Sequence, residues 1–507
     1  MKSSNKIAVG VLIGIAVLAL GLLVANNILE AKIKKGIEAN LDNIQATYRK
    51  VDVKILNRSA EVFDARLSIK GKQLSLDLIR LENINLYEYI VNKNVEVGKL
   101  IINDPNVKIF DLPSRSKDSI APKKSKSFKN KIFINKVNIN GGSLKIFEKD
   151  SLQHRLFAKI RAIDLKDVLI DSASLKAKLP FIFSPGQIKI DSIFYDLDQL
   201  QVLSTGKIQI KDQDLGVKNL QILPKYSKAG HQKYLKNEKD RYILKIDSLA
   251  LNSFKWDPEN EESRFQSENT LISNFHFEIY RDKLKPDETS YKSLYSKMLR
   301  DLPIKLKLDH VKLVNGYLKY EERLHANREP GVVDFSNLNG EIENITNFDL
   351  DRKDFPTTRV RARANFMKSA PLSIDWSFKV NNKSDYFRIS GEMGNLSAEQ
   401  MNQFLKPAMN VEAHGEILKM NFVYTGNSTK ATGDMRLEYK DFKVEVLQKD
   451  KQKKNKLVSA LANLLVKNKA LNDKAEYKEI TYERDQTKSF WNYFWNLIRK
   501  GAMKTFL

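Results

Sequence analysis

One spacing of apolar residues recurs along this chain and limits the folds that it can adopt. After a first apolar residue, others follow 3, 5, 10 and 12 positions later. The two close pairs have the period of two that places side chains on one face of a β-strand. The copies begin at Val97, Ile134, Leu165, Ile190, Ile246 and Leu308, and the copy at Ile246 is two residues shorter between its pairs. The chain is therefore predicted to be mostly β.

Turn-forming residues separate the two pairs of a copy. Examples are Asn103-Asp104-Pro105-Asn106, Asn140-Gly141-Gly142-Ser143 and Asn315-Gly316. Such residues between strand-like runs predict a β-hairpin, and the odd spacing between the first two apolar positions predicts a bend or bulge. The copies lie at irregular intervals, so they form a divergent repeat and not an array of fixed period. The expected fold is an elongated, curled antiparallel sheet, open as a β-groove, with a few peripheral helices.

The two faces of the predicted sheet differ in chemistry. Between the last two apolar positions of the copies lie Lys108, Lys145, Lys176, Gln201, Lys255 and Lys319. A sheet with one apolar face must cover it. The cover is either a second layer, as in an ordinary sandwich, or acyl chains in an open groove, and alternation alone does not separate the two. The candidate groove residues are Leu100, Ile102, Val107, Ile109, Val137, Ile139, Leu144, Ile146, Val168, Ile170, Ile193, Tyr195, Val311, Leu313, Leu318 and Tyr320.

An unbroken apolar run of 19 residues, from Ile7 to Ala25, precedes all of these copies. Its length is close to the ~20 residues that span a membrane as a helix. Lys2 and Lys6 before it predict a cytoplasmic N-terminus. A cleaved signal peptide is the alternative, and either interpretation exports the rest of the chain. We expect a single-pass inner-membrane protein with its bulk in the periplasm.

Composition and motifs give little sign of a reaction centre. There is no cysteine, so disulfides, thiolate metal sites and a cysteine nucleophile are excluded. The 6 histidines are scattered, and none of the common catalytic or nucleotide-binding motifs occurs. We therefore expect no catalytic residue, no metal site and no cofactor. The net charge of +24 suits anionic lipid head groups better than nucleic acid in an exported chain, although a lysine-rich composition alone also explains it.

The chain divides into five predicted parts. These are an anchor at 1–27, a helical linker at 28–50, the β-groove at 51–447 with a mobile loop at 113–131, a basic loop and helix at 448–488, and a terminal helix at 489–507. Helices are expected near 28–48, 86–92, 289–302, 397–405, 456–471 and 489–506.

The terminal helix is predicted to be amphipathic and aromatic. Its candidate contact residues are Phe490, Trp491, Phe494, Trp495, Leu497, Ile498, Arg499 and Lys500. Aromatic helices with basic residues lie in membrane interfaces or dock into partner grooves. A helix that plugs the end of the sheet is the alternative.

Together these features resemble the AsmA-like family of bacterial envelope proteins. The resemblance rests on the anchor with its helical continuation, the strand, short helix and hairpin of 74–110, and the aromatic tail at 490–507, which is similar to that of Bacteroidota members. It also rests on a block that runs from Phe335-Ser336-Asn337-Leu338-Asn339-Gly340 through Gly415-Glu416-Ile417 to residues 431–439. The likeness covers nearly the whole chain.

The resemblance implies a periplasmic β-groove, anchored in the inner membrane, that moves phospholipid towards the outer membrane. Membrane phospholipid is then the expected partner, with an outer-membrane or envelope protein at the C-terminal end. An assembly scaffold for outer-membrane proteins, with a closed protein core, is the alternative. An envelope hydrolase is disfavoured because its motifs are missing.

The native protein is expected to keep residues 1–25 and to resist extraction by high salt or alkaline carbonate, because an apolar helix is not released by weakening ionic contacts. Membrane fractionation and N-terminal sequencing measure this. A mature chain that begins at Asn26 would instead show a cleaved signal peptide.

Overall fold

The computed structural model describes residues 44–54, 56–69, 71–92, 94–110, 131–148, 153–174, 181–257, 263–447 and 478–506. The predicted anchor, most of the predicted linker and of the loop at 113–131, and the helix predicted at 456–471 lie outside these ranges. Within them, no helix is both long and apolar enough to cross a membrane.

The described chain is mostly β, with a large mixed sheet and few helices. It divides into two compact units, which we describe separately. Unit 1 comprises Met1–Asp198, Val202–Asn219 and Asp257–Ser263, and unit 2 comprises Gln199–Gln201, Leu220–Trp256 and Arg264–Leu507.

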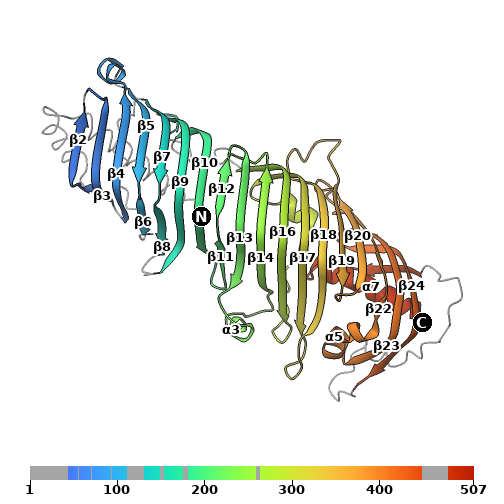
Figure 1. Cartoon of the computed structure of the whole chain (residues 1–507). Coiled ribbons are helices and arrows are strands. Elements are labelled where there is room, and N and C mark those ends of the chain that lie inside the picture. The colour runs from blue at the N-terminus through green and yellow to red at the C-terminus, as the bar shows by residue number, and fades with distance from the viewer. Residues whose placement is uncertain are drawn as a thin grey trace, which may run out of the picture. The chain divides into compact units, whose positions relative to one another are not determined.

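The strands of unit 1 follow one another across the sheet in chain order, with β5 and β6 end to end, and likewise β7 and β8 (Figure 1). Their bounds are β1 (Ile44–Thr47), β2 (Lys50–Lys54), β3 (Ser59–Ile69), β4 (Lys72–Ile84), β5 (Val95–Asn103), β6 (Asn106–Phe110), β7 (Ile132–Asn140), β8 (Ser143–Phe147), β9 (His154–Ile170), β10 (Ile182–Asp196), β11 (Gln201–Thr205) and β12 (Ile208–Lys211), with β13 (Asp214–Pro224) continuing into unit 2. A π-helix, η1 (Glu88–Asn92), precedes β5. The core is a cluster of aliphatic side chains that includes Leu81, Leu100 and Ile170.

Unit 2 contains the longest strands and most of the helices. Its strands are β14 (Arg241–Asn252), β15 (Lys255–Asp257), β16 (Arg264–Asp282), β17 (Lys305–Arg323), β18 (Gly331–Thr346), β19 (Thr358–Phe366), β20 (Ala370–Phe378), β21 (Phe387–Met393), β22 (Leu396–Ser397), β23 (Val411–Gly426), β24 (Lys430–Val446) and β25 (Lys478–Glu483). Its helices are α3 (Lys228–Gln232), α4 (Tyr295–Arg300), α5 (Ala398–Met409) and α7 (Phe490–Phe506). Pairing runs β14, β16, β17, β18, β19, β20, β21, β23, β24, β25.

Two of the predicted hairpins in unit 1 are wrong. Strands β5 and β6 both pair with β4, and β7 and β8 both pair with β9. The residues between each pair therefore interrupt one strand path and do not reverse the chain. Backbone hydrogen bonds to the neighbouring strand continue at the interruptions. The N–H of Asp104 donates to the backbone oxygen of Asn140 at 2.8 Å, and the N–H of Gly141 donates to that of Arg161 at 2.9 Å. A long neighbouring strand offers partners on both sides of the break, and this outweighs the local turn signal.

Asn315-Gly316 is also not a turn, because it lies inside the continuous strand β17. Asn315 has φ +53° and forms an irregularity in the pairing with β18. Gly316 is required there since a Cβ would overlap the ring of Phe275. The copy that begins at Ile190 does form an antiparallel hairpin, in which β10 pairs with β11.

The predicted bend or bulge takes two forms: the pairing of β10 with β9 shifts register on both sides of Ile190, whereas other copies lose one pair without a change of register. In β4, Asn83 interrupts the pairing between Glu82↔Lys99 and Ile84↔Val97 and has φ +56°. Asp167, Asn274 and Asn344 adopt the same left-handed conformation at the matching points of β9, β16 and β18. Because both strands skip one residue at such a point, the first apolar residue of a copy stays on the same face as the pair that follows it, despite the odd spacing.

The sheet is mixed, whereas a mostly antiparallel sheet was predicted. The pairs β5–β7, β6–β8 and β16–β17 are parallel. Parallel neighbours need a long connection, and residues 283–304, which include α4, supply one between β16 and β17.

The helix predictions are largely confirmed within the described residues. Helices lie at η1, α4, α5 and α7, although α4 is shorter than expected and α3 was not predicted. The linker prediction of 28–50 is wrong at its end, because Ile44–Thr47 forms β1. There the hydrogen bonds that β3 offers override the local helical pattern.

Gly142 has φ +112°, and a Cβ on it would lie 2.6 Å from the backbone oxygen of Pro105. Gly142→Ala should therefore lower the free energy of unfolding by about 1–3 kcal/mol. Gly216→Ala is the control, because its Cβ would come no closer than 4.0 Å to its neighbour, and alanine in a strand should be neutral or stabilise by about 0.5–1 kcal/mol. Urea titration measures both free energies. Equal effects of the two variants would contradict the claim that only Gly142 occupies a position that another residue would strain.

Candidate functional site

One face of the unit 2 sheet is apolar across several strands. Leu249 of β14 opposes Ile272 of β16, Ile272 opposes Leu313 of β17, and the row continues through Gly340 and Ala362. We call this surface of β14–β19 the apolar face. Its parallel rows contain Tyr242, Leu244, Leu251, Thr270, Phe277, Ile279, Val311, Leu318, Tyr320, Val333, Phe335, Ile342 and Val360.

Most of the apolar face is partly exposed. Leu313, Leu318 and Phe335 are half-buried, whereas Leu251 and Val311 are buried. Water therefore reaches many of these apolar side chains. Large continuous apolar surfaces of this kind mark binding sites for apolar matter or for other proteins.

The opposite face of the same strands is charged and hydrogen-bonded. Lys319 of β17 pairs with Glu278 of β16 at 3.0 Å, and Lys228 pairs with Glu321 at 2.7 Å. The hydroxyl of Tyr317 donates to Asp334, and burial together with that carboxylate raises the pKa of Tyr317 to about 12. This face is adapted to water, so the amphipathic character of the sheet is confirmed.

Charged groups border the apolar face at one end of its strands. Arg281, two residues beyond Ile279, donates two hydrogen bonds to Asp240 at 2.5 and 2.6 Å. Glu322 lies two residues beyond Tyr320, and burial raises the pKa of its carboxyl above the ordinary value despite the nearby Lys283 and Arg281. An occupant of the face would thus meet apolar groups along it and polar groups at this border.

A second ionic cluster holds the segment that leads into α7. Lys283 pairs with Glu238 at 2.6 Å, and Lys488 pairs with Asp287 at 2.7 Å. Arg484 donates to the backbone oxygen of Lys488. These contacts fix the start of α7 relative to β14 and β16.

Helix α7 covers the continuation of the apolar face over the last strands of unit 2. Phe490 stacks on Trp376 of β20 with ring centroids 4.7 Å apart, and Tyr424 of β23 donates to the backbone oxygen of Leu497. Phe490 and Leu497 are buried, whereas Trp491 and Trp495 are exposed. The tail therefore packs as an end plug through one side and leaves two indoles outside.

The lysines of α7 contact the edge of the sheet. Lys500 donates to the backbone oxygen of Thr481 at 2.5 Å, and Lys504 donates to that of Glu479 at 2.8 Å. Both acceptors belong to β25, which pairs with β24. In this arrangement the two ammonium groups bind backbone carbonyls, whereas the sequence pattern predicted a membrane interface or a partner groove for this basic helix.

The structure places the predicted groove residues on the expected faces but in different surroundings. Val311, Leu313, Leu318 and Tyr320 belong to the apolar face. The twelve candidates in unit 1 share one face by register. Of these, Leu144, Ile146, Ile193 and Tyr195 are half-buried. The other eight are buried, namely Leu100, Ile102, Val107, Ile109, Val137, Ile139, Val168 and Ile170.

Sequence reasoning missed several members of the site. Phe277 and Ile279 of β16 and Phe335 of β18 lie outside the recurring spacing, although their alternation with polar residues is visible. Tyr493 of α7 was also missed, and it is 1% exposed. Of the tail candidates not yet placed, Phe494 and Ile498 are half-buried against the sheet cluster, and Arg499 is half-buried.

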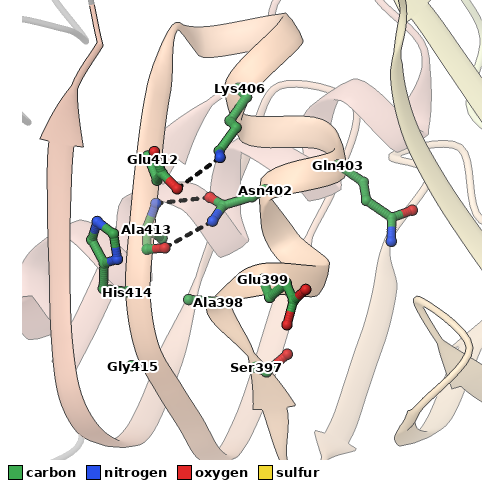
Figure 2. A pocket seen from close by; sticks show the side chains of 10 residues that line it. All are labelled: Ser397, Ala398, Glu399, Asn402, Gln403, Lys406, Glu412, Ala413, His414 and Gly415. Atoms are coloured by element: carbon green, nitrogen blue, oxygen red, sulfur yellow. Dashed lines mark hydrogen bonds and ion pairs between the residues drawn. The ribbon is translucent and has the colours of Figure 1, made fainter.

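A shallow polar hollow of about 730 Å³ lies between α5 and β23 (Figure 2). Lys406 pairs there with Glu412 at 2.7 Å, and the Asn402 amide exchanges two hydrogen bonds of 2.8 Å with the backbone of Ala413. These groups satisfy one another. Among the residues that the structure describes, no cluster of side chains suits a metal ion.

Comparison with known proteins adds no relative: no family model matches the chain, and no curated protein matches it significantly.

Leu497→Ala should lower the free energy of unfolding by about 2–5 kcal/mol, because it removes a fully buried side chain. Trp491→Ala, on the exposed side of the same helix, should lower it by only about 1 kcal/mol, because it removes one hydrogen bond, to Tyr295, and little buried surface. Chemical denaturation followed by far-ultraviolet circular dichroism measures both. If both changes were small, α7 would not be packed on the sheet in solution.

Proposed function

We propose that this protein carries phospholipid between the inner and outer membranes of a bacterial envelope, by holding acyl chains on the apolar face. The observation that carries the proposal is a continuous, partly exposed apolar surface over β14–β19 whose reverse side is charged. The resemblance to the AsmA-like family supports it, as does the apolar run of Ile7–Ala25, which would anchor the chain in the inner membrane with its bulk in the periplasm.

The physical basis is passive burial. Each CH₂ group of an acyl chain that leaves water gains about 0.8 kcal/mol. The backbone groups of the strands are occupied by the ladders, so the face offers an acyl chain apolar contacts. Neighbouring rows are chemically similar, and a chain can therefore shift between them at little cost. Head groups would remain in water or at the charged border near Arg281.

The alternative is an assembly scaffold for outer-membrane proteins with a closed protein core. Its support is the aliphatic cluster of unit 1, where Leu100 and Ile170 are each 1% exposed. Side chains buried to that degree are typical of a packed core. The apolar face of unit 2 differs from this cluster, and it distinguishes the two proposals.

A photo-crosslinking residue placed at Leu313 should capture phospholipid in cells, whereas the same residue at Lys312 should not. The two positions are adjacent in β17 but lie on opposite faces, and Lys312 is exposed. Mass spectrometry of the adducts identifies the captured molecule. Capture of a protein at Leu313 would favour the scaffold, and lipid capture at both positions would show non-specific contact with membranes.

A further inference from the structure

The apolar face does not end at β19 but continues beneath α7. The row of Leu313, Gly340 and Ala362 extends by register through Ile374 of β20, Gly391 of β21, Phe422 of β23 and Met435 of β24. Exposure falls along this row. Leu313 is half-buried, Phe422 is 2% exposed and Met435 is 0% exposed. The same sheet surface is thus open at one end of the row and sealed at the other.

Helix α7 leaves no space for an acyl chain on the sealed part. A Cβ on Gly501 would overlap the sulfur of Met435 and lie 2.8 Å from Ile480. The contacts of Phe490 with Trp376 and of Leu497 with Tyr424 continue this close packing along the helix. An occupant that followed the sheet to β25 would have to lift α7.

Two exposed indoles stand on α7 where the covered part begins. Trp491 is 53% exposed and Trp495, one helical turn later, is 40% exposed. The indole N–H of Trp491 donates to the hydroxyl of Tyr295 of α4 at 2.8 Å. The ring of Trp495 lies 5.7 Å from that of Phe404 of α5. The pair is therefore held between α4 and α5 and not on a free chain end.

We infer that phospholipid enters or leaves the apolar face sideways at α7, across Trp491 and Trp495, and does not pass beneath α7 to β25. This inference rests on the proposed function. An indole combines a large apolar surface with one polar edge, which suits the boundary between acyl chains and water. Lys500 and Lys504 are bonded to β25, so this passage depends on apolar contact and not on attraction of head groups.

A disulfide staple tests the route. The chain has no cysteine, and the Cβ positions of Gly501 and Met435 are 3.1 Å apart, so a shift of α7 by about 0.5 Å would bring them into the range of a disulfide. The double variant Gly501→Cys/Met435→Cys in the full-length protein would lock α7 onto β24. Transfer of a fluorescent phospholipid between vesicles of phosphatidylethanolamine and phosphatidylglycerol should be the same for the oxidised and reduced forms. Transfer that stops on oxidation and returns on reduction would overturn the inference.

The indoles are tested in parallel. Trp491→Ser/Trp495→Ser should slow transfer about tenfold, which corresponds to about 1.4 kcal/mol, while lipid capture at Leu313 persists. Trp256→Ser is the matched control, because Trp256 is 57% exposed on β15 and should not affect transfer. An unchanged rate in the Trp491/Trp495 variant would also overturn the inference. Absence of lipid capture at Leu313 would instead refute the proposed function, whereas capture with transfer blocked by the staple would refute the lateral route alone.

Discussion

The register of the backbone hydrogen bonds is the constraint on which the rest of this structure depends. Side chains alternate along a strand, so a slip of one residue in β17 would turn Leu313 towards the charged surface and Lys312 towards the apolar one. No disulfide can hold the register, since the chain lacks cysteine. It is held by long ladders, in which β16 and β17 run side by side over most of their length, and by the burial of one face.

The interruptions of the strands show how the register can be kept although the apolar residues have an odd spacing. A left-handed Asn or Asp at the same level of neighbouring strands, such as Asn274 in β16 and Asn315 in β17, removes one residue from the alternation. Because the neighbours skip a residue at the same level, the rows of apolar partners resume beyond it. The recurring spacing of the sequence thus marks interruptions that are aligned between neighbouring strands, and it marks a hairpin only in the copy that begins at Ile190.

Local pattern predicts which face a residue occupies but not what lies against that face. The period of two was sufficient to group Leu100 with Ile102 and Leu313 with Val311, because it depends on strand geometry alone. It could not separate the buried cluster of unit 1 from the open face of unit 2, since covering depends on distant segments. Residues 103–106 carry turn chemistry, and only the length of β4 decides that they interrupt a strand. In the tail, amphipathicity identified α7 but not which side would meet the sheet.

The contacts of Lys500 and Lys504 have a consequence for how copies of this protein meet. A terminal strand with unpaired carbonyls can recruit the strand of another copy and extend the sheet from molecule to molecule. At β25, two ammonium groups of the same chain already occupy the oxygens of Glu479 and Thr481. A second copy would have to displace both before its own backbone could bond there. Two side chains of the final helix thus protect this edge of the sheet against pairing with strands of other copies.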